Sequence, residues 1–182
     1  MARFKYLEKE DVAPEHRDLV GKINLSKLTI HSPGAARVFN ALAMYIRNTS
    51  KLDRRLREMA IIQVGYLARS PYEYSHHVKI GLDVGVSESD IHAIADDTAG
   101  KPTTLDPLTK AVLKAARELT AAVELPDETF AALRRHLDDE RLMDLLLAIC
   151  AYNSVIRLLA ALRIDVEEEY LPYLERFPLP AD

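Results

Sequence analysis

The sequence contains a single cysteine among its 182 residues. Cys150 therefore cannot form an intrachain disulfide, and redox chemistry that needs two thiols in one chain is excluded. The surrounding residues, 147–151, are otherwise apolar. Because a cysteine in such surroundings is usually a buried core residue, we predict an inert thiol.

The sequence also lacks an uninterrupted apolar run of about 18 residues, the length that spans a bilayer. Its first residues, Met-Ala-Arg-Phe-Lys, do not form the apolar segment of a secretory signal. We therefore expect a cytoplasmic protein with no membrane partner. The formal net charge of −4 and the pI near 5.9 argue against a basic surface, so no nucleic-acid partner is expected.

Glycine is scarce, at six residues, and the branched residues recur at helical rather than alternating spacing. No segment therefore predicts a strand. Apolar residues make up 48% of the chain, enough to fill one core. We predict a single all-α domain over residues 1–182, with about eight helices.

Six of the expected helices flank a central pair, at about residues 15–27, 33–48, 87–96, 106–123, 126–137 and 139–164. We expect the helix over 33–48 to pack on the central pair. Residues 1–14 and the acidic, tyrosine-containing tail at 167–180 are expected to lie across the surface of this chain or of a neighbouring subunit. Asp144 and Asn153 are the polar residues in the apolar helix over 139–164.

The central pair begins with the most apolar stretch, residues 54–68. Its apolar residues from Met59 to Ala68 surround the helix instead of forming one stripe, which is typical of a segment buried on most sides. Asp53 can accept hydrogen bonds from the first turn. Glu58 is therefore expected at the edge of the core, where burial would raise its pKa.

The second helix of the pair begins at Ser70-Pro71, because proline lacks an N–H and moves the residue before it out of the helical region. Ser70, Pro71 and Glu73 have the spacing of a capping box. Gly85 is expected to end this helix in a left-handed conformation. The two helices should meet at a sharp corner.

On this second helix, Glu73 shares a face with His76 and His77, which follow it by three and four residues. A carboxylate beside an imidazole fixes its tautomer and raises its pKa, so this pattern is suited to acid–base chemistry. Simpler roles exist for each residue. Glu73 could be only a cap, His77 a solvated histidine, and Glu58 a partner of Arg54 or Arg55.

The runs Leu56-Arg-Glu58-Met-Ala-Ile-Ile, Tyr72-Glu73-Tyr-Ser-His-His77 and Gly85-Val-Ser87 resemble the core of the carboxymuconolactone decarboxylase family, which has the AhpD-like all-helical fold. The alkylhydroperoxidase branch has the pattern Glu, eleven residues, Cys-x-x-Cys, three residues, His, seven residues, Gly. Here Glu58, His77 and Gly85 keep every spacing, while Ser70 and Glu73 replace both cysteines. The match is specific over about residues 50–95.

This resemblance implies a small-molecule lyase acting on a small organic acid or lactone, with no cofactor, and assembled with itself as a homotrimer or hexamer. We expect Glu58, Glu73 and His77 to be catalytic, with His77 as the proton donor. Tyr72, His76 and Asn153 are expected to bind the substrate. Arg54 or Arg57 could steer a carboxylate, although both are expected on an exposed helix face. A proton-transfer isomerase or hydratase would fit the same residues.

The same residues bear on three other functions. A thiol peroxidase, as in the cysteine-bearing branch, is disfavoured because neither Ser70 nor Glu73 can act as a thiolate. A non-catalytic helical oligomer that binds a small molecule remains open. Metal binding is disfavoured, since only Glu58 could join Glu73 and His77 as a third ligand, and we expect no metal.

Two further expectations are geometric. The corner should place Glu58 and His77 face to face across the helix pair, with carboxylate and imidazole within about 8 Å of each other. An internal duplication is also suggested, because Asp144 and Tyr152 follow Glu58 and Tyr66 at the same offset of 86 residues.

Overall fold

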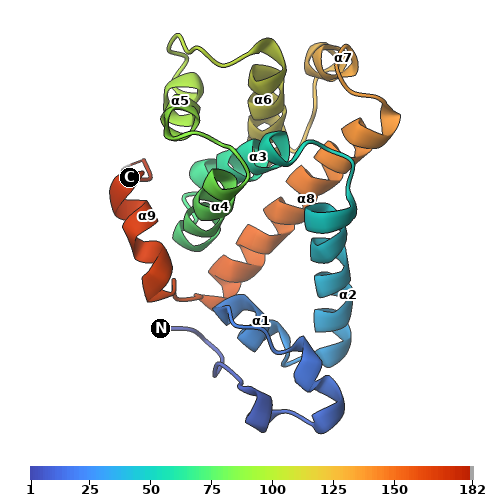
Figure 1. The fold of residues 1–182 in the computed structure, drawn as a ribbon, viewed down its shortest axis with the longest axis vertical. Coiled ribbons are helices and arrows are strands. Elements are labelled where there is room, and N and C mark those ends of the chain that lie inside the picture. The colour runs from blue at the N-terminus through green and yellow to red at the C-terminus, as the bar shows by residue number, and fades with distance from the viewer. Residues whose placement is uncertain (181–182) are drawn as a thin grey trace.

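Helix α3 (Arg54–Leu67) is the element around which the other helices are arranged (Figure 1). The computed structural model describes residues 1–180, which contain helices and no strand, so the predicted all-α class is confirmed. The remaining α-helices are α1 (Asn24–Thr29), α2 (Pro33–Met44), α4 (Pro71–Asp83), α5 (Glu88–Thr98), α6 (Pro107–Ala121), α7 (Asp127–Arg134), α8 (Asp139–Leu162) and α9 (Leu171–Arg176). Short 3-10 turns lie at Lys9–Asp11, Pro14–Leu19 and Glu168–Tyr170, and a π turn lies at Tyr45–Thr49.

Helix α3 is buried on all sides along most of its length, as its apolar sequence predicts. Every residue from 56 to 65 is buried, and the helix packs against α4, α6, α8 and α5. The Asp53 carboxylate accepts the Leu56 N–H at 3.0 Å, which confirms the predicted N-cap. Gly65 allows α4 to come close, since a Cβ there would lie 3.1 Å from the Tyr74 backbone.

The corner between α3 and α4 forms at Arg69, which has a positive φ of 47°. The Ser70 N–H then donates to the Gly65 carbonyl at 3.0 Å, and Pro71 opens α4. The predicted capping box is wrong. The Ser70 side chain makes no cap hydrogen bond, and the Glu73 side chain turns toward His77. Gly85 has the predicted left-handed conformation, with φ of 98°.

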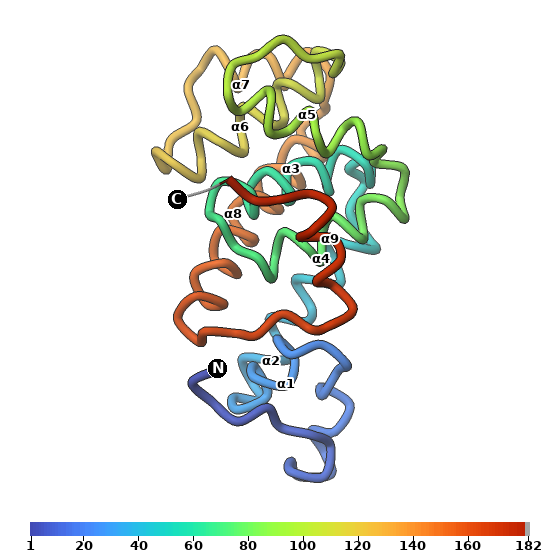
Figure 2. The backbone as a smooth tube through the Cα atoms, turned by 90° about the vertical axis from the view of Figure 1, so that its left-hand side faces the viewer, coloured from blue at the N-terminus to red at the C-terminus, as the bar shows by residue number. Residues whose placement is uncertain are grey.

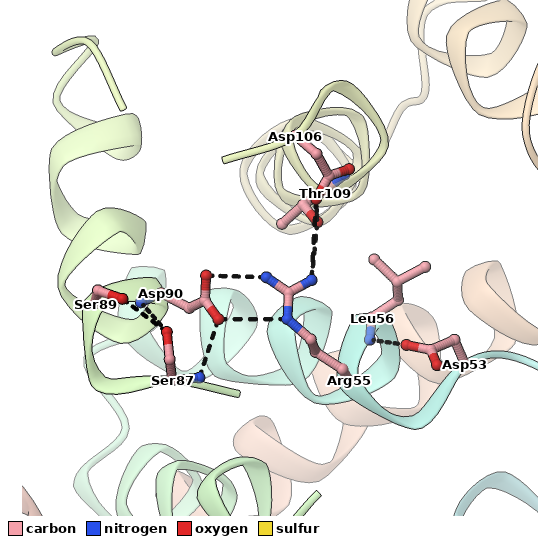
Figure 3. Close-up of polar contacts among 8 residues, drawn as sticks. All are labelled: Asp53, Arg55, Leu56, Ser87, Ser89, Asp90, Asp106 and Thr109. Atoms are coloured by element: carbon pink, nitrogen blue, oxygen red, sulfur yellow. Dashed lines mark hydrogen bonds and ion pairs between the residues drawn. The ribbon is translucent and has the colours of Figure 1, made fainter. Parts of the chain in front are cut away.

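Arg55 connects the N-terminal ends of α3, α5 and α6 (Figure 3). Its guanidinium lies 2.9 Å from the Asp90 carboxylate and donates to the Thr109 hydroxyl at 3.2 Å. Asp90 also closes a capping box with Ser87 at the start of α5. Arg55 therefore holds α3, α5 and α6 together and does not pair with Glu58.

In the N-terminal third, one sequence-based prediction fails and a second holds only in part. The helix expected over residues 15–27 is divided into the turn Pro14–Leu19 and α1, with the break at Gly21, which lies directly against Ser26. The helix expected over residues 33–48 packs on the central pair only in part. Helix α2 lies mainly against α1 and the turn Pro14–Leu19, whereas the π turn that follows it contacts α3, where Arg57 donates to the carbonyl oxygens of Ile46 and Arg47.

The C-terminal segment lies on α4, as Figure 2 shows. The turn Glu168–Tyr170 and α9 both pack against that helix, so the expected docking of the tail takes place within the chain. The N-terminal arm lies on the end of α8, where the Arg3 N–H donates to the Leu162 carbonyl at 2.8 Å. The C-terminal segment therefore covers α4, and the N-terminal arm covers the C-terminal end of α8.

Exposed apolar side chains, together called the apolar surface below, lie on α2 and near the start of α8. Val38 is 73% exposed and Met143 is 64% exposed, with Leu42 and Met44 also exposed. Cys150 lies exposed on α8, so the prediction of a buried thiol is wrong. By length and composition α8 is apolar enough to span a membrane. This is weak evidence for a membrane span, because ten residues of the helix are buried in the protein interior, as in the core helix of a soluble protein. The predicted cytoplasmic location stays a prediction.

We expect this apolar surface to be covered by further copies of the chain, because exposed apolar patches of this kind usually mark interfaces. Light scattering at micromolar concentration should give a trimer or hexamer rather than the 20.5 kDa monomer. The double variant Val38→Glu, Met143→Glu should reduce the measured mass. Val123→Glu, an equally exposed position elsewhere, is the control. A monomeric mass for the unaltered protein would contradict the expectation.

Candidate active site

Glu58 on α3 and His77 on α4 face each other across the corner. The Glu58 Oε2 and His77 Nδ1 atoms are 2.6 Å apart, which confirms the predicted proximity of the two side chains. Glu58 is completely buried and His77 is 5% exposed. The pair therefore lies within the core and not at its edge.

Arg57 supports Glu58 from within the same helix. Its Nε donates to Glu58 Oε1 at 2.8 Å, and its Nη1 donates to the carbonyl groups of Ile46 and Arg47 at 3.1 and 2.9 Å. Arg57 is 3% exposed, so the expectation of an exposed arginine that steers substrate is wrong for this residue. Arg54 is exposed, as expected.

Glu73 completes the cluster from the other side of the imidazole. Its Oε1 lies 3.0 Å from His77 Nε2, and the residue is 3% exposed. Each ring nitrogen of His77 thus lies within ion-pair distance of a carboxylate oxygen. This arrangement favours the doubly protonated imidazolium, because both nitrogens must then donate.

The electrostatics of the cluster follow from this geometry. Burial alone would lower the pKa of His77, but the charge and hydrogen bond of Glu58, followed by those of Glu73, raise it to about 9. Burial would likewise raise the pKa of Glu58, but His77 and then Arg57 hold it below its ordinary value. The predicted rise for Glu58 is wrong, because its two cationic partners outweigh desolvation.

A cavity of about 130 Å³ adjoins the cluster. An engineered protein cavity of about 150 Å³ holds benzene, so this space suits a molecule with about one five- or six-membered ring. The polar part of its lining is Arg47, Tyr72, Glu73, His76, His77, Tyr152 and Ser154. The apolar part is Ile23, Leu25, Phe39, Leu42, Ala43, Ile46, Ile80, Ala151 and Val155.

Tyr152 on α8 is a site residue that sequence reasoning did not identify. Its ring meets the His77 ring edge to face, with centroids 4.7 Å apart. Burial, and then the negative charge of Glu73, raise the pKa of its phenol, so the hydroxyl stays protonated. That hydroxyl has no hydrogen-bond partner within residues 1–180. The only signal in the sequence was the offset of 86 residues from Tyr66.

Tyr72 and His76 also line the cavity, but both are held by the C-terminal segment. His76 stacks between Tyr72 and Tyr170, with centroids 4.1 and 3.5 Å away. Its Nε2 lies 3.1 Å from Glu167, without hydrogen-bond geometry. Burial lowers the pKa of His76, so this imidazole is mainly neutral at pH 7. Their predicted role in substrate binding stays a prediction.

Asn153 does not lie with the other predicted site residues. Its amide donates to Thr120 at 2.9 Å, on the side of α8 away from the cavity, and it is not part of the lining. A larger groove of about 570 Å³ lies near the α3–α4 corner, but no histidine or carboxylate lines it. Among residues 1–180, no group of three or more His, Cys, Asp or Glu side chains is placed to hold a metal ion.

Comparisons with known proteins agree with this architecture. Residues 33–118 match the model of the Carboxymuconolactone decarboxylase family. A peroxidase-related protein from Ralstonia eutropha JMP134, described as an alkylhydroperoxidase AhpD core, has 19% identity and a TM-score of 0.78, covering 98% of each chain. A putative antioxidant defence protein AhpD from Agrobacterium tumefaciens has 23% identity and a TM-score of 0.70, covering 77% of this chain and 95% of that one.

A variant of the debrominase Bmp8 in complex with 2,3,4-tribromopyrrole has 19% identity and a TM-score of 0.75, covering 90% of this chain and 87% of that one. At these identities the likeness concerns the fold, and the predicted AhpD-like fold is confirmed. No curated protein matches the sequence.

The raised pKa of His77 generates a prediction about stability. Its charged form should stabilise the fold fully below about pH 6.5, and this contribution should be lost as the pH rises through about 9. The loss should be on the order of 3 kcal/mol in free energy of unfolding. Urea unfolding followed by circular dichroism at several pH values between 6 and 9.5 measures it.

His77→Gln should flatten this dependence, whereas His92→Gln, at an exposed histidine, should keep it. An unaltered pH dependence in the His77 variant would show that the imidazole is not charged in the folded protein.

Proposed function

We propose that this chain, as a member of the carboxymuconolactone decarboxylase family, is an acid–base enzyme that transfers a proton to or from a carbon atom of a small organic acid or lactone. The observation that carries the proposal is the buried series Glu58, His77 and Glu73, which ends at the cavity. Glu73 is the last carboxylate of the series and part of the cavity lining. It is therefore the group that meets the substrate.

These roles differ from those expected from the sequence, where His77 was the proton donor. Both His77 nitrogens lie beside carboxylates, at 2.6 and 3.0 Å, so neither is directed at a substrate. Glu73 has one oxygen at His77 and a second that forms no hydrogen bond within residues 1–180. We assign Glu73 as the catalytic acid–base group and His77 as its positioning residue and proton source.

For decarboxylation, the bond between the carboxyl group and the adjacent carbon breaks and carbon dioxide leaves. The electron pair is delocalised into a conjugated carbonyl. His77 Nε2–H passes its proton to the Glu73 carboxylate, and the resulting carboxylic acid protonates the carbon and returns to the carboxylate. The neutral imidazole beside Glu58 then takes up a proton from solvent. For isomerisation, Glu73 would remove the proton from one carbon and return it to another.

The surroundings of Glu73 suit this chemistry. The apolar walls exclude water, which strengthens electrostatic interactions and limits proton exchange with solvent. Tyr152 contributes a protonated hydroxyl to the same cavity, where it can donate to a carbonyl oxygen on which negative charge develops. A ring of five or six atoms fills the volume.

A thiol peroxidase is not supported by this site. Peroxide reduction needs a thiolate within reach of the peroxide, and no cysteine lines the cavity. Cys150 neighbours the lining residue Ala151 in sequence but is exposed on α8. The positions of the two redox cysteines are occupied here by Ser70 and Glu73.

Glu73→Gln should lower proton transfer by at least about 100-fold, because general acid–base groups contribute that much or more. The protein is incubated in D₂O with small oxo acids and unsaturated lactones, and NMR measures deuterium incorporation and carbon dioxide release. Glu124→Gln, at an exposed carboxylate, is the matched control. If the Glu73 variant retains the rate of the unaltered protein, the assignment of Glu73 is wrong.

Thiol-dependent consumption of an organic hydroperoxide should stay at background, since the cavity holds no thiol. Cys150→Ser should leave the deuterium exchange intact. Hydroperoxide turnover with a dithiol reductant that disappears in the serine variant would overturn the acid–base reading.

A further inference from the structure

The cavity carries one cation that the acid–base series does not use. Arg47 lines the cavity and is exposed to solvent. Its guanidinium has no hydrogen-bond or ion-pair partner among residues 1–180. A free arginine on an open surface needs no explanation, but this one borders the space beside Glu73 and His77.

The backbone that carries Arg47 is held by hydrogen bonds from α3 and α8. Arg47 lies in the π turn Tyr45–Thr49, a local structure that occurs frequently at functional sites. On one side, Arg57 donates to the carbonyl oxygens of Ile46 and Arg47. The buried guanidinium therefore connects this turn directly with Glu58.

The ends of the turn are fixed to α8. The Tyr45 and Ser50 hydroxyl groups each donate to the Asp144 carboxylate at 2.7 Å, and the Lys51 N–H donates to it at 3.0 Å. Asp144 is buried, and these hydrogen bonds hold its pKa below the ordinary value. The turn is thus held from both sides while the Arg47 side chain remains available.

The charges around the cavity leave Arg47 unbalanced. Glu58 is paired with Arg57 at 2.8 Å, and Glu73 with His77 at 3.0 Å. His76 is mainly neutral because burial lowers its pKa. The Glu167 carboxylate lies beside His76, but it accepts from the Tyr72 hydroxyl and the Asn24 N–H and does not line the cavity. Arg47 is therefore a cation of the lining that has no carboxylate partner within residues 1–180, which favours an anionic ligand.

We propose that Arg47 is the specificity-determining residue of this site and anchors the carboxylate of a small organic monoacid. This inference rests on the proposed function, since it names the substrate class of the same cavity. Arginine binds a carboxylate through two parallel hydrogen bonds, which fixes the orientation of the ligand as well as its charge. The anchored carboxylate stays at the solvent side, and the apolar body of the ligand extends to Glu73.

Matched pairs of acid and amide test this inference: benzoate with benzamide, and crotonate with crotonamide. The members of each pair have nearly the same shape and differ in charge. Binding is measured by ligand-observed NMR and calorimetry at fixed ionic strength. The unaltered protein should bind each acid at least about tenfold more tightly than its amide.

Arg47→Gln should remove this preference while leaving the amide affinity unchanged, which also shows that the cavity is intact. Arg47→Lys should keep part of the preference, because the charge remains while the two-pronged geometry is lost. Arg54→Gln, which removes an exposed cation at the start of α3, should behave like the unaltered protein.

Equal affinity for acid and amide in the unaltered protein, no binding of either, or a preference that persists in Arg47→Gln would each overturn the inference. The proposed function fails separately. If Glu73→Gln retains proton exchange while the carboxylate preference depends on Arg47, the anion site stands and the assignment of Glu73 is wrong.

Discussion

The site depends on a charged imidazole held in the protein interior. Removing one ion from water costs several kcal/mol, and an isolated buried charge would usually be neutralised by a shift in its pKa. His77 stays charged because a carboxylate lies at each ring nitrogen, and Glu58 can be one of them because Arg57 balances it. The buried charges of Arg57, Glu58, His77 and Glu73 therefore depend on one another. Truncating any one of these side chains would leave an uncompensated charge in the core.

The same four side chains link the site to the surrounding scaffold. Arg57 extends from Glu58 to the backbone of the turn Tyr45–Thr49, and Asp144 fixes both ends of that turn to α8. The cavity lies between α2, α4 and α8, so its polar groups come from segments far apart in the sequence. Arg55 fixes the other side of α3 to α5 and α6 and leaves Glu58 to His77. A rigid frame of this kind suits proton transfer, which depends on distances of a few tenths of an ångström.

Errors in the sequence interpretation have identifiable physical causes. The capping box at Ser70 fails because the Ser70 N–H already donates to the Gly65 carbonyl, and Glu73 pairs with the buried imidazole of His77 instead. The prediction for Cys150 was wrong because α8 is apolar on nearly every side. The apolar neighbours of Cys150 therefore did not show which side of the helix faces the core, and the cysteine lies on the exposed side. Asn153 was a reasonable guess as the polar residue of an apolar helix, yet its neighbour Tyr152 faces the cavity. Adjacent helical residues point in directions about 100° apart.

The sequence by itself determined most of the helices, the sharp corner at Ser70-Pro71 and the meeting of Glu58 with His77. These features follow from local rules: capping at Asp53, the missing N–H of proline, the freedom of Gly85, and the rise per residue along two connected helices. Only the tertiary structure decided the charges and the shape of the site. The pKa of Glu58 depends on Arg57 and His77 together, and the cavity needs α2, α8 and Tyr152 in place. Such long-range contacts arise when distant segments pack, and no local pattern in the chain records them.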